Sequence, residues 1–407
     1  MSESTVSYNP FQPGFAEDPY PHYQEMRRAD PVHQSPMGVW VLFRHQDVFR
    51  LLRDPTLSVE DRNAHSTPMT ELMREAVGDE ADVGIATMLS RDPPDHTRLR
   101  RLVSKAFTPR TVEQLRPRIE HLVDAALDQA SEAEWNVIDL LAFPLPFHVI
   151  SELLGTPQTD TVQLRQWSGT LVRSLEPVYD PELLKAIAEA GQNIFGLILE
   201  IIEWKRKNPA DDLLSGLIAA EHEGDTLSAD ELAAQVVLLY LAGHETTVNL
   251  IGNGTLALLR HRSQFDRLRD EPGIADNAVE ELLRYDSPVQ MTRRIFLSPL
   301  EVDGKHIEAG AVAILGLGAS NRDPDQWGAN ADDLDLTRPG ASQHVSFGGG
   351  HHYCLGSHLA RLEGSVALTK LVRRFPNLDL AGDPVWNGRI NLRGLSKLSV
   401  TIGQRAR

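Results

Sequence analysis

The sequence has little cysteine, few uninterrupted hydrophobic runs and a shortage of positive charge. Cys354 is the one cysteine among 407 residues, so no intramolecular disulfide forms, which favours a reducing, cytoplasmic location. The longest apolar runs, residues 140–150 and 236–243, are shorter than the roughly 18–20 residues that span a bilayer. The N-terminus has no secretory signal pattern. With 40 basic and 57 acidic side chains, the formal charge of −17 argues against general nucleic-acid binding.

The remaining composition is that of a globular protein, with 41% hydrophobic and 24% charged residues. No internal repeat or low-complexity linker divides the chain, so we expect a single domain over residues 1–407. Helical periodicity dominates from about residue 95 to residue 375. Strands are expected in residues 38–43, in residues 293–315 around a turn at Asp303 and Gly304, and in residues 398–402. The sequence therefore predicts a mainly α fold with small sheets.

The cysteine lies in a glycine-rich segment, Phe347 to Gly356, which reads FGGGHHYCLG and precedes a helical pattern in residues 357–375. Glycines allow tight or left-handed backbone and direct amide groups toward one point. A cysteine just before a helix N-terminus lies at the positive end of the helix dipole, which favours the thiolate. This placement predicts a thiolate that ligates a metal, in a loop that a flat cofactor approaches closely.

Two other interpretations of the cysteine fit this context less well. Lone cysteines are usually inert and buried, but inert core cysteines do not lie in glycine-rich loops. A structural zinc site typically uses two ligand pairs at short, regular spacings. One sulfur and an irregular set of neighbouring histidines do not give that pattern. These histidines are His344, His351, His352 and His358.

A helix of about 30 residues is expected after Ser228, which forms an S-x-x-E capping-box pattern with Glu231. Its middle carries the sequence AGHETT, residues 242–247, in which glycine and two threonines conflict with regular helix. That conflict predicts a local widening that exposes a carbonyl group. Close helix packing at Gly243, with an incidental Glu245, would explain the same sequence.

Two charged patterns complete the candidate motifs. Residues 92–100, DPPDHTRLR, begin a helix in which His96 and Arg100 share a face, whereas Arg98 lies about 200° around the axis from Arg100. Glu281 and Arg284 have the i,i+3 spacing of a common helical ion pair. Taken alone, the basic helix is more typical of a solvated surface helix, and the Glu281–Arg284 spacing carries almost no information.

Together, these motifs resemble those of the cytochrome P450 family, the haem-thiolate monooxygenases. The cysteine segment is similar to F-G-x-G-x-[H/R]-x-C-x-G, and residues 242–246 are similar to [A/G]-G-x-[D/E]-T. HTRLR and the E-x-x-R of Glu281 and Arg284, which in the family joins a later arginine (here Arg338) in a structural ion cluster, occur in the family's order. The resemblance covers nearly the whole chain. It implies the triangular, mainly α cytochrome P450 fold, with haem b between the long helix and the cysteine-loop helix.

The resemblance also implies roles for individual residues. Cys354 would be the axial ligand of the haem iron, Thr246 would hydrogen-bond to dioxygen, and Glu245 would relay protons from solvent. Arg294 is the alternative to its neighbour for one propionate contact. The other implied cofactor contacts, several of them to the propionates, are His96, Arg100, Ala242, Arg293, Phe347, Gly348, His352 and Gly356.

The implied function is a monooxygenase that hydroxylates or epoxidises a hydrophobic small molecule with O₂. No flavin or iron–sulfur domain is recognised, so electrons from NAD(P)H are expected through a separate ferredoxin and ferredoxin reductase. A negatively charged protein needs a local basic surface to bind an acidic ferredoxin. A peroxide-dependent haem-thiolate enzyme and a non-catalytic haem sensor are the alternatives, and the Glu245–Thr246 pair argues against both. Candidates for the basic surface are Arg98, Arg101, Lys105, Arg110, Lys370, Arg373 and Arg374.

Apolar residues expected around the substrate indicate a hydrophobic compound, such as a macrolide or other polyketide, or a terpenoid. They come from residues 54–90, the first half of the long helix, residues 289–292 and residues 392–395. Gln290 or Thr292 would orient a polar group of the substrate. The candidate pocket residues are Met88, Leu89, Leu238, Leu239, Val289, Met291 and Leu395.

Overall fold

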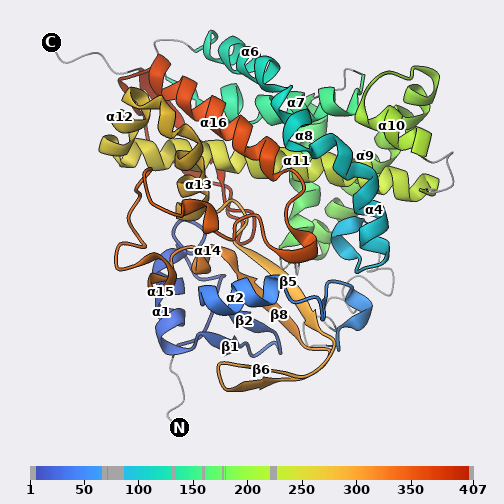
Figure 1. Cartoon of the computed structure of the whole chain (residues 1–407), viewed down its shortest axis with the longest axis vertical. Helices are drawn as coiled ribbons and strands as arrows, with labels where there is room; N and C mark the ends of the chain where they lie inside the picture. The colour runs from blue at the N-terminus through green and yellow to red at the C-terminus, as the bar shows by residue number, and fades with distance from the viewer. Residues whose placement is uncertain are drawn as a thin grey trace.

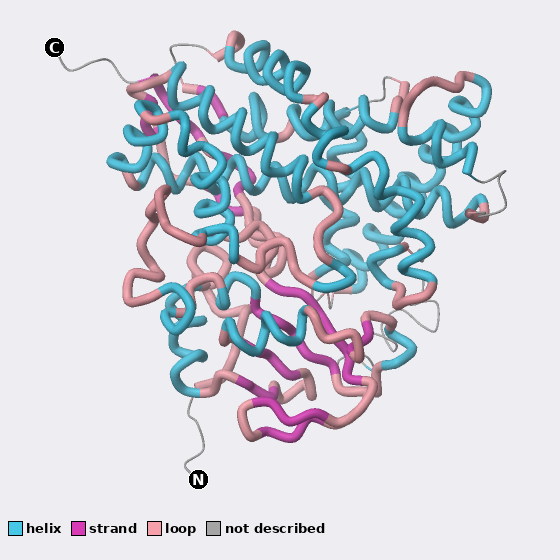
Figure 2. Tube along the Cα trace, viewed as in Figure 1, coloured by secondary structure: helices cyan, strands magenta, loops and turns pink. Residues whose placement is uncertain are grey.

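The computed structural model describes residues 6–66, 71, 87–130, 134–157, 161–176, 178, 180–220 and 227–402. Long helices make up one side of the molecule, and a sheet with short helices makes up the other (Figure 1). Figure 2 shows most strands gathered in that second part and a smaller group near the C-terminus. This arrangement confirms the mainly α fold with small sheets. None of the helices in the described ranges is long and apolar enough to cross a membrane.

The helices differ in length and in position. Short helices lie against the sheet: α1 (Tyr20–Ala29), α2 (His45–Leu52), α14 (Leu317–Ser320) and α15 (Pro324–Trp327). The helical side contains α4 (Asp95–Ser104), α5 (Pro109–Glu113), α6 (Arg116–Leu127), α7 (Pro144–Leu154), α8 (Thr161–Leu171), α9 (Pro181–Lys207), α10 (Leu213–Ala220), α11 (Ala229–Arg260), α12 (Arg262–Asp270), α13 (Ala275–Tyr285) and α16 (Ser357–Arg374). Short 3₁₀ or π turns connect them, among them η3 (Met88–Ser90), η5 (Ile138–Ala142), η6 (Val172–Leu175) and η9 (Gly350–His352).

The main sheet has the strand order β1 (Val32–Gln34), β2 (Trp40–Leu42), β8 (Val312–Gly316), β5 (Met291–Phe296) and β3 (Leu57–Ser58). β6 (Leu300–Val302) and β7 (Lys305–Ile307) form a hairpin at the predicted turn, where Asp303 and Gly304 have φ of 50° and 73°. Positive φ at both central residues is typical of tight hairpin turns. Smaller sheets pair β4 (Trp135–Asn136), β12 (Ser399–Ile402) and β9 (Leu378–Leu380), and pair β10 (Val385–Trp386) with β11 (Leu395–Lys397).

Helix α11 forms the centre of the helical side. Its start has the predicted capping box, in which Glu231 N–H donates to Ser228 Oγ at 3.1 Å and Ser228 N–H donates to Glu231 Oε2 at 2.9 Å. Most of its side chains are buried. The predicted widening does not occur, because α11 is unbroken from Ala229 to Arg260. Instead, the hydroxyl of Thr246 donates to the Ala242 carbonyl at 3.0 Å, within the regular helix.

The cysteine-loop helix α16 packs closely on α11. A Cβ atom added at Gly364 would lie 2.9 Å from Leu250 Cδ2, so the glycine allows the two helices to approach. Figure 1 shows α16 crossing in front of α11. Because both helices contribute to the same buried hydrophobic cluster, the position of the cysteine segment relative to α11 is set by core packing.

Glu363 is a carboxylic acid buried in α16 at 1% exposure. Neither carboxyl oxygen has a hydrogen-bond partner among the described residues. Burial raises the pKa of Glu363 to about 8, and the nearby Thr247 hydroxyl opposes only part of this rise. The side chain is therefore held in its neutral form at neutral pH.

Glu363→Gln is expected to weaken the pH dependence of stability. Folded Glu363 keeps its proton up to about pH 8, whereas the unfolded side chain loses it near its ordinary pKa of 4.5. Unfolding therefore releases a proton in this window, and raising the pH lowers the free energy of unfolding by at most about 1.4 kcal/mol per pH unit. The measurement is the melting temperature near pH 5 and pH 8. An equal decrease in the wild type and the variant would contradict the prediction.

Candidate active site

The cysteine loop turns sharply and lies against α2. Gly348 and Gly350 have φ of 70° and 63°, and a Cβ atom at Gly350 would lie 2.6 Å from the carbonyl oxygen of Leu52. The Cys354 N–H donates to the Phe347 carbonyl at 2.9 Å, which closes the loop. Glycine is thus required both by the backbone conformation and by the contact with α2.

Cys354 lies immediately before α16 and is exposed in the structure, whereas Phe347 is buried beneath the guanidinium of Arg361. The protein atoms around the sulfur nevertheless exert a burial effect that raises the pKa of the thiol, and the Gly356 N–H, Arg100 and Arg361 oppose that rise. The loop and the helix N-terminus therefore favour the thiolate as expected, but burial outweighs them. A metal cation at the sulfur would supply the missing stabilisation.

Four basic side chains from α4, β5 and the cysteine loop meet beside the cysteine. The rings of His96 and His352 have centroids 4.3 Å apart, and Arg100 Nη2 donates to the Tyr353 carbonyl at 2.7 Å. Burial, followed by the charges of His96, Arg294 and Arg100, lowers the pKa of His352 to about 3. At neutral pH the histidines are therefore neutral and the two arginines carry the positive charge of the cluster, which attracts anions.

Within the described part of the chain, no carboxylate forms an ion pair with any of these four side chains. His96 is 2% exposed, and its Nδ1 has no hydrogen-bond partner there. Arg294 is 5% exposed, and burial lowers its pKa to about 10. Arg294 Nη1 donates to the Arg293 carbonyl at 2.7 Å, but a carbonyl does not neutralise its charge, and a buried cation without a counter-charge is costly. Arginine binds carboxylates strongly through paired N–H donors. The cluster therefore fits a bound dianion, as the two propionates of haem would provide.

Of the two arginines on β5 that are candidates for the propionate contact, Arg294 fits better than Arg293. The Arg293 guanidinium forms an ion pair with Asp61 and donates to the Val59 carbonyl at 3.3 Å. Successive side chains of a strand point to opposite faces, so Arg294 points inward, where it affects the pKa of His352. The alternation of side chains along β5 therefore determines which of the two arginines belongs to the cluster.

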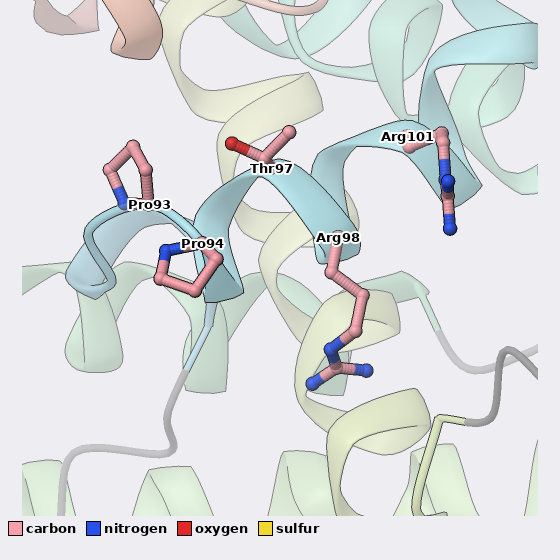
Figure 3. Close-up of a pocket in the computed structure, with 5 residues that line it drawn as sticks. All are labelled: Pro93, Pro94, Thr97, Arg98 and Arg101. Carbon is pink, nitrogen blue, oxygen red and sulfur yellow. The ribbon is translucent and has the colours of Figure 1, made fainter.

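Arg100→Ala is expected to reduce haem retention several-fold more than Arg98→Ala, its matched control on the same helix. Arg100 contacts the cysteine loop, whereas Arg98 forms an ion pair with Glu231 at the start of α11. Figure 3 shows Arg98 and Arg101 extending from successive turns of α4. The measurement is the haem-to-protein ratio after transfer of haem to an excess of apomyoglobin. Equal haem loss from both variants would show that the position of an arginine around α4 does not determine whether it binds haem.

Glu245 and Thr246 lie side by side in the middle of α11 and are partly exposed. Ala242, one turn earlier, is exposed although most of the helix is buried. The middle of α11 is therefore not fully covered by the described residues, which suits a space for cofactor and substrate. The Glu245 carboxylate forms an ion pair with Arg389, a residue that belongs to no sequence motif.

The three charges expected to form a structural cluster are buried together. Arg284 Nε lies 2.7 Å from Glu281 Oε2, and Arg338 Nε lies 3.1 Å from Glu281 Oε1. Both arginines also donate to backbone carbonyls, including that of Asp333. Because these carbonyls belong to the segment that leads to the cysteine loop, the cluster fixes that segment on α13.

The candidate pocket residues separate into two groups. Met88, Leu239 and Leu395 are at most 7% exposed and belong to the main hydrophobic cluster, so they pack in the core. Leu238 and Leu239 are about 100° apart on α11, which explains why both do not face the same space. Leu89 is 54% exposed, and much of the connection before it lies outside the described residues. Leu238, Val289 and Met291 are partly exposed, and all seven residues stay candidates for the pocket.

Fold and site together define a haem-thiolate enzyme: a cysteine loop beside an anion-binding cluster, and a long helix with an acid–alcohol pair. The sequence profile named "Cytochrome P450" matches residues 31–386. The chain is 42% identical to the vitamin D(3) 25-hydroxylase of Pseudonocardia autotrophica, over 99% of this chain and 98% of that protein. It is 41% identical to cytochrome P450 107B1 of Saccharopolyspora erythraea, over 97% of both proteins.

A solved structure shows the same fold. The polyketide synthase cytochrome P450 PksS of Bacillus subtilis superposes with a TM-score of 0.87 at 36% identity, over 98% of this chain and 100% of that chain. The chain belongs to the cytochrome P450 family. Haem is the cofactor of this family, and the expectation of a haem-dependent monooxygenase is confirmed at the level of the family.

Proposed function

We propose that this cytochrome P450 binds the haem iron through Cys354 and the haem propionates through His96, Arg100, Arg294 and His352. The observation that carries the proposal is the convergence of these basic side chains beside an exposed thiol without a carboxylate partner in the described residues. When bound, haem supplies the activation of O₂ that no amino-acid side chain provides. Phe347, Gly348, Gly356 and Ala242 would shape its immediate surroundings.

The acid–alcohol pair on α11 would control protons in the same site. The Thr246 hydroxyl is available to hydrogen-bond to dioxygen when it leaves the Ala242 carbonyl, which lies 3.0 Å away. Glu245 would exchange protons with solvent and pass them toward Thr246. A positioned proton path matters because the apolar pocket otherwise excludes water.

The substrate class that we propose is a bulky, largely apolar compound, hydroxylated or epoxidised at one carbon. Leu89 is exposed, and Leu238, Val289 and Met291 are partly exposed, as expected of side chains that an apolar substrate would cover. Relatives include a polyketide biosynthesis cytochrome P450 and a 6-deoxyerythronolide B hydroxylase. A polyketide or a compound of similar size is therefore the preferred class.

Electrons would come from NAD(P)H through a separate ferredoxin reductase and ferredoxin. The protein would act in the cytoplasm as a single catalytic domain. Ion pairs reduce the charge of the expected basic docking surface: Lys370 and Arg374 pair with Asp124 of α6 and with Asp128 at its end, and Arg98 pairs with Glu231. A surface hollow of about 500 Å³ remains on α4 (Figure 3). It is lined by Pro93, Pro94, Thr97, Arg98 and Arg101, and it is the docking position that we propose.

The proposed function is tested with the purified holoenzyme. We expect bound haem, a thiolate-type spectrum of the reduced carbon monoxide complex, and NAD(P)H-driven oxidation with ferredoxin and reductase. Vitamin D₃ is the first probe, because a relative is named for its hydroxylation. Protein without haem would refute the haem proposal. Turnover with hydrogen peroxide alone would favour the peroxide-dependent alternative, and haem without turnover on an apolar panel would favour a sensor.

A further inference from the structure

A loop near the C-terminus reaches the proton-relay residue on α11. This loop, residues 387–394, connects β10 to β11. Arg389 Nη1 donates to Glu245 Oε1, and Arg389 Nη2 donates to the Gly169 carbonyl of α8 at 3.1 Å. The side chains of Arg389 and Glu245 are only 11% and 14% exposed. One guanidinium therefore joins the loop, α8 and α11 in a mostly buried position, where removing one partner leaves the other charge buried and unpaired.

The same loop is clamped next to Arg389 by a buried carboxylate. Glu176 follows η6 and is 8% exposed. Its oxygens accept the backbone N–H groups of Ile390 at 2.8 Å, Asn391 at 3.0 Å and Leu392 at 3.2 Å. Three backbone donors to one carboxylate fix the loop conformation. The backbone that carries Arg389 is thereby held by the segment that follows α8.

The second oxygen of Glu245 faces His244 on the same helix. His244 is 3% exposed, and its Nδ1 lies 3.0 Å from the Tyr240 carbonyl, to which it donates. Burial lowers the pKa of His244, although the charge of Glu245 opposes this shift. The neutral ring with its proton on Nδ1 has no proton on Nε2, which lies 3.5 Å from Glu245 Oε2. Neutral His244 therefore donates no hydrogen bond to Glu245, and Arg389 is the donor that holds the carboxylate.

We propose that Arg389 is a positioning residue for Glu245, and that the Glu176 clamp makes this positioning depend on contact between the α8–η6 segment and the C-terminal loop. Arg389 holds Oε1 of the acid, so it sets where the carboxyl group lies relative to Thr246. This inference rests on the proposed role of Glu245 in proton transfer. It adds that the acid is kept in place by residues about 70 positions before it and about 140 positions after it in the chain.

The first test compares Arg389→Ala with Arg389→Lys in the holoenzyme, with vitamin D₃ as the probe and ferredoxin and reductase in excess. In Arg389→Ala we expect the rate of NAD(P)H oxidation to fall roughly 10- to 100-fold, the range found when a catalytic group is misplaced by about 1 Å. The solvent deuterium isotope effect on that rate should rise, with little change in KM. Arg389→Lys should restore most of the rate, because it retains a cation.

A matched control removes another arginine–glutamate pair. Arg118 Nη2 lies 2.6 Å from Glu152 Oε1, an ion pair between α6 and α7. Arg118→Ala should leave the rate and the isotope effect unchanged. If Arg118→Ala and Arg389→Ala lower the rate equally, or if Arg389→Ala leaves the isotope effect unchanged, the proposal is wrong. If Arg389→Ala does not fold with haem, Arg389→Gln replaces it as the variant without the cation: a lower rate with a raised isotope effect supports the proposal, and a wild-type rate and isotope effect overturn it.

A double-mutant cycle separates this inference from the proposed function. If Arg389 acts through Glu245, Arg389→Ala should lower the rate in wild type but not in Glu245→Gln. Equal losses in both backgrounds would overturn the positioning role and leave the proton role of Glu245 intact. A wild-type rate in Glu245→Gln itself would instead refute the proposed function. Glu176→Ala should give a smaller loss that likewise disappears in Glu245→Gln.

Discussion

Product formation is expected to disappear when Cys354 is replaced by serine. Serine is nearly isosteric, but its hydroxyl is a poor ligand that donates far less electron density to iron than a thiolate. The loop should keep its shape, because its glycines and the Phe347 carbonyl contact do not involve the sulfur. The measurement is product per NAD(P)H consumed, together with the spectrum of the reduced carbon monoxide complex. Wild-type turnover in Cys354→Ser would refute the ligand assignment.

Haem binding should be affected less than activity in this variant. His96, Arg100, Arg294 and His352 remain to hold the propionates, so we expect a partial loss of haem. Cys354→His is the informative companion, because imidazole is a good iron ligand without thiolate character. It should bind haem, lack the thiolate-type spectrum and fail to oxidise the probe. If Cys354→His oxidised the probe normally, a thiolate would not be needed for the chemistry.

The parts of the fold that the sequence predicted are those with strong local signals. The capping box of Ser228 and Glu231 begins α11 where expected, because its hydrogen bonds depend on residues three apart. The turn at Asp303 and Gly304 forms because its chemistry is local as well. In contrast, the expected widening at Thr246 depends on whether surrounding helices tolerate it, and α11 stays unbroken there.

Several features of the site depend on long-range geometry that the sequence leaves open. Arg293 and Arg294 are adjacent in the sequence, and only the register of β5 in the sheet determines which one points inward. In the sequence, Lys370 and Arg374 suggest a basic surface. In the structure, α6 packs beside α16, and both side chains form ion pairs with acids. Similarly, Arg389 comes 144 residues after Glu245 and belongs to no recognisable motif, so no local pattern links the two.

The pKa of the Cys354 thiol could not be predicted from the sequence, for a different reason. The sequence correctly indicates a cysteine beside a helix N-terminus and near arginines, and all of these groups do oppose the rise of its pKa. The sequence does not reveal that burial is the larger effect, because burial depends on atoms from the whole fold. A metal ligand that is reluctant to ionise by itself couples thiolate formation to metal binding.

Thr246→Ala is expected to divert reduced oxygen from product to hydrogen peroxide. Haem binding and electron uptake should persist, because the variant leaves Cys354, the basic cluster and Glu245 in place. The change removes a single hydroxyl, which in the structure donates to the Ala242 carbonyl at 3.0 Å. Loss of one positioned catalytic hydrogen bond costs about 10²–10³ in the step that it serves. Product formation should fall far more than NAD(P)H consumption.

Thr255→Ala is the matched control, because Thr255 lies on the same helix and its hydroxyl likewise donates to the carbonyl four residues earlier, that of Ile251, at 2.7 Å. Thr255 is 1% exposed and buried in the core, so its removal should lower stability without changing the fate of oxygen. The measurement is peroxide and product formed per NAD(P)H consumed, with the same ferredoxin and reductase throughout. If Thr246→Ala and Thr255→Ala both kept wild-type coupling, Thr246 would not direct the proton. If both raised peroxide equally, the effect would come from loosening α11, because only Thr246 is placed beside the exposed turn at Ala242.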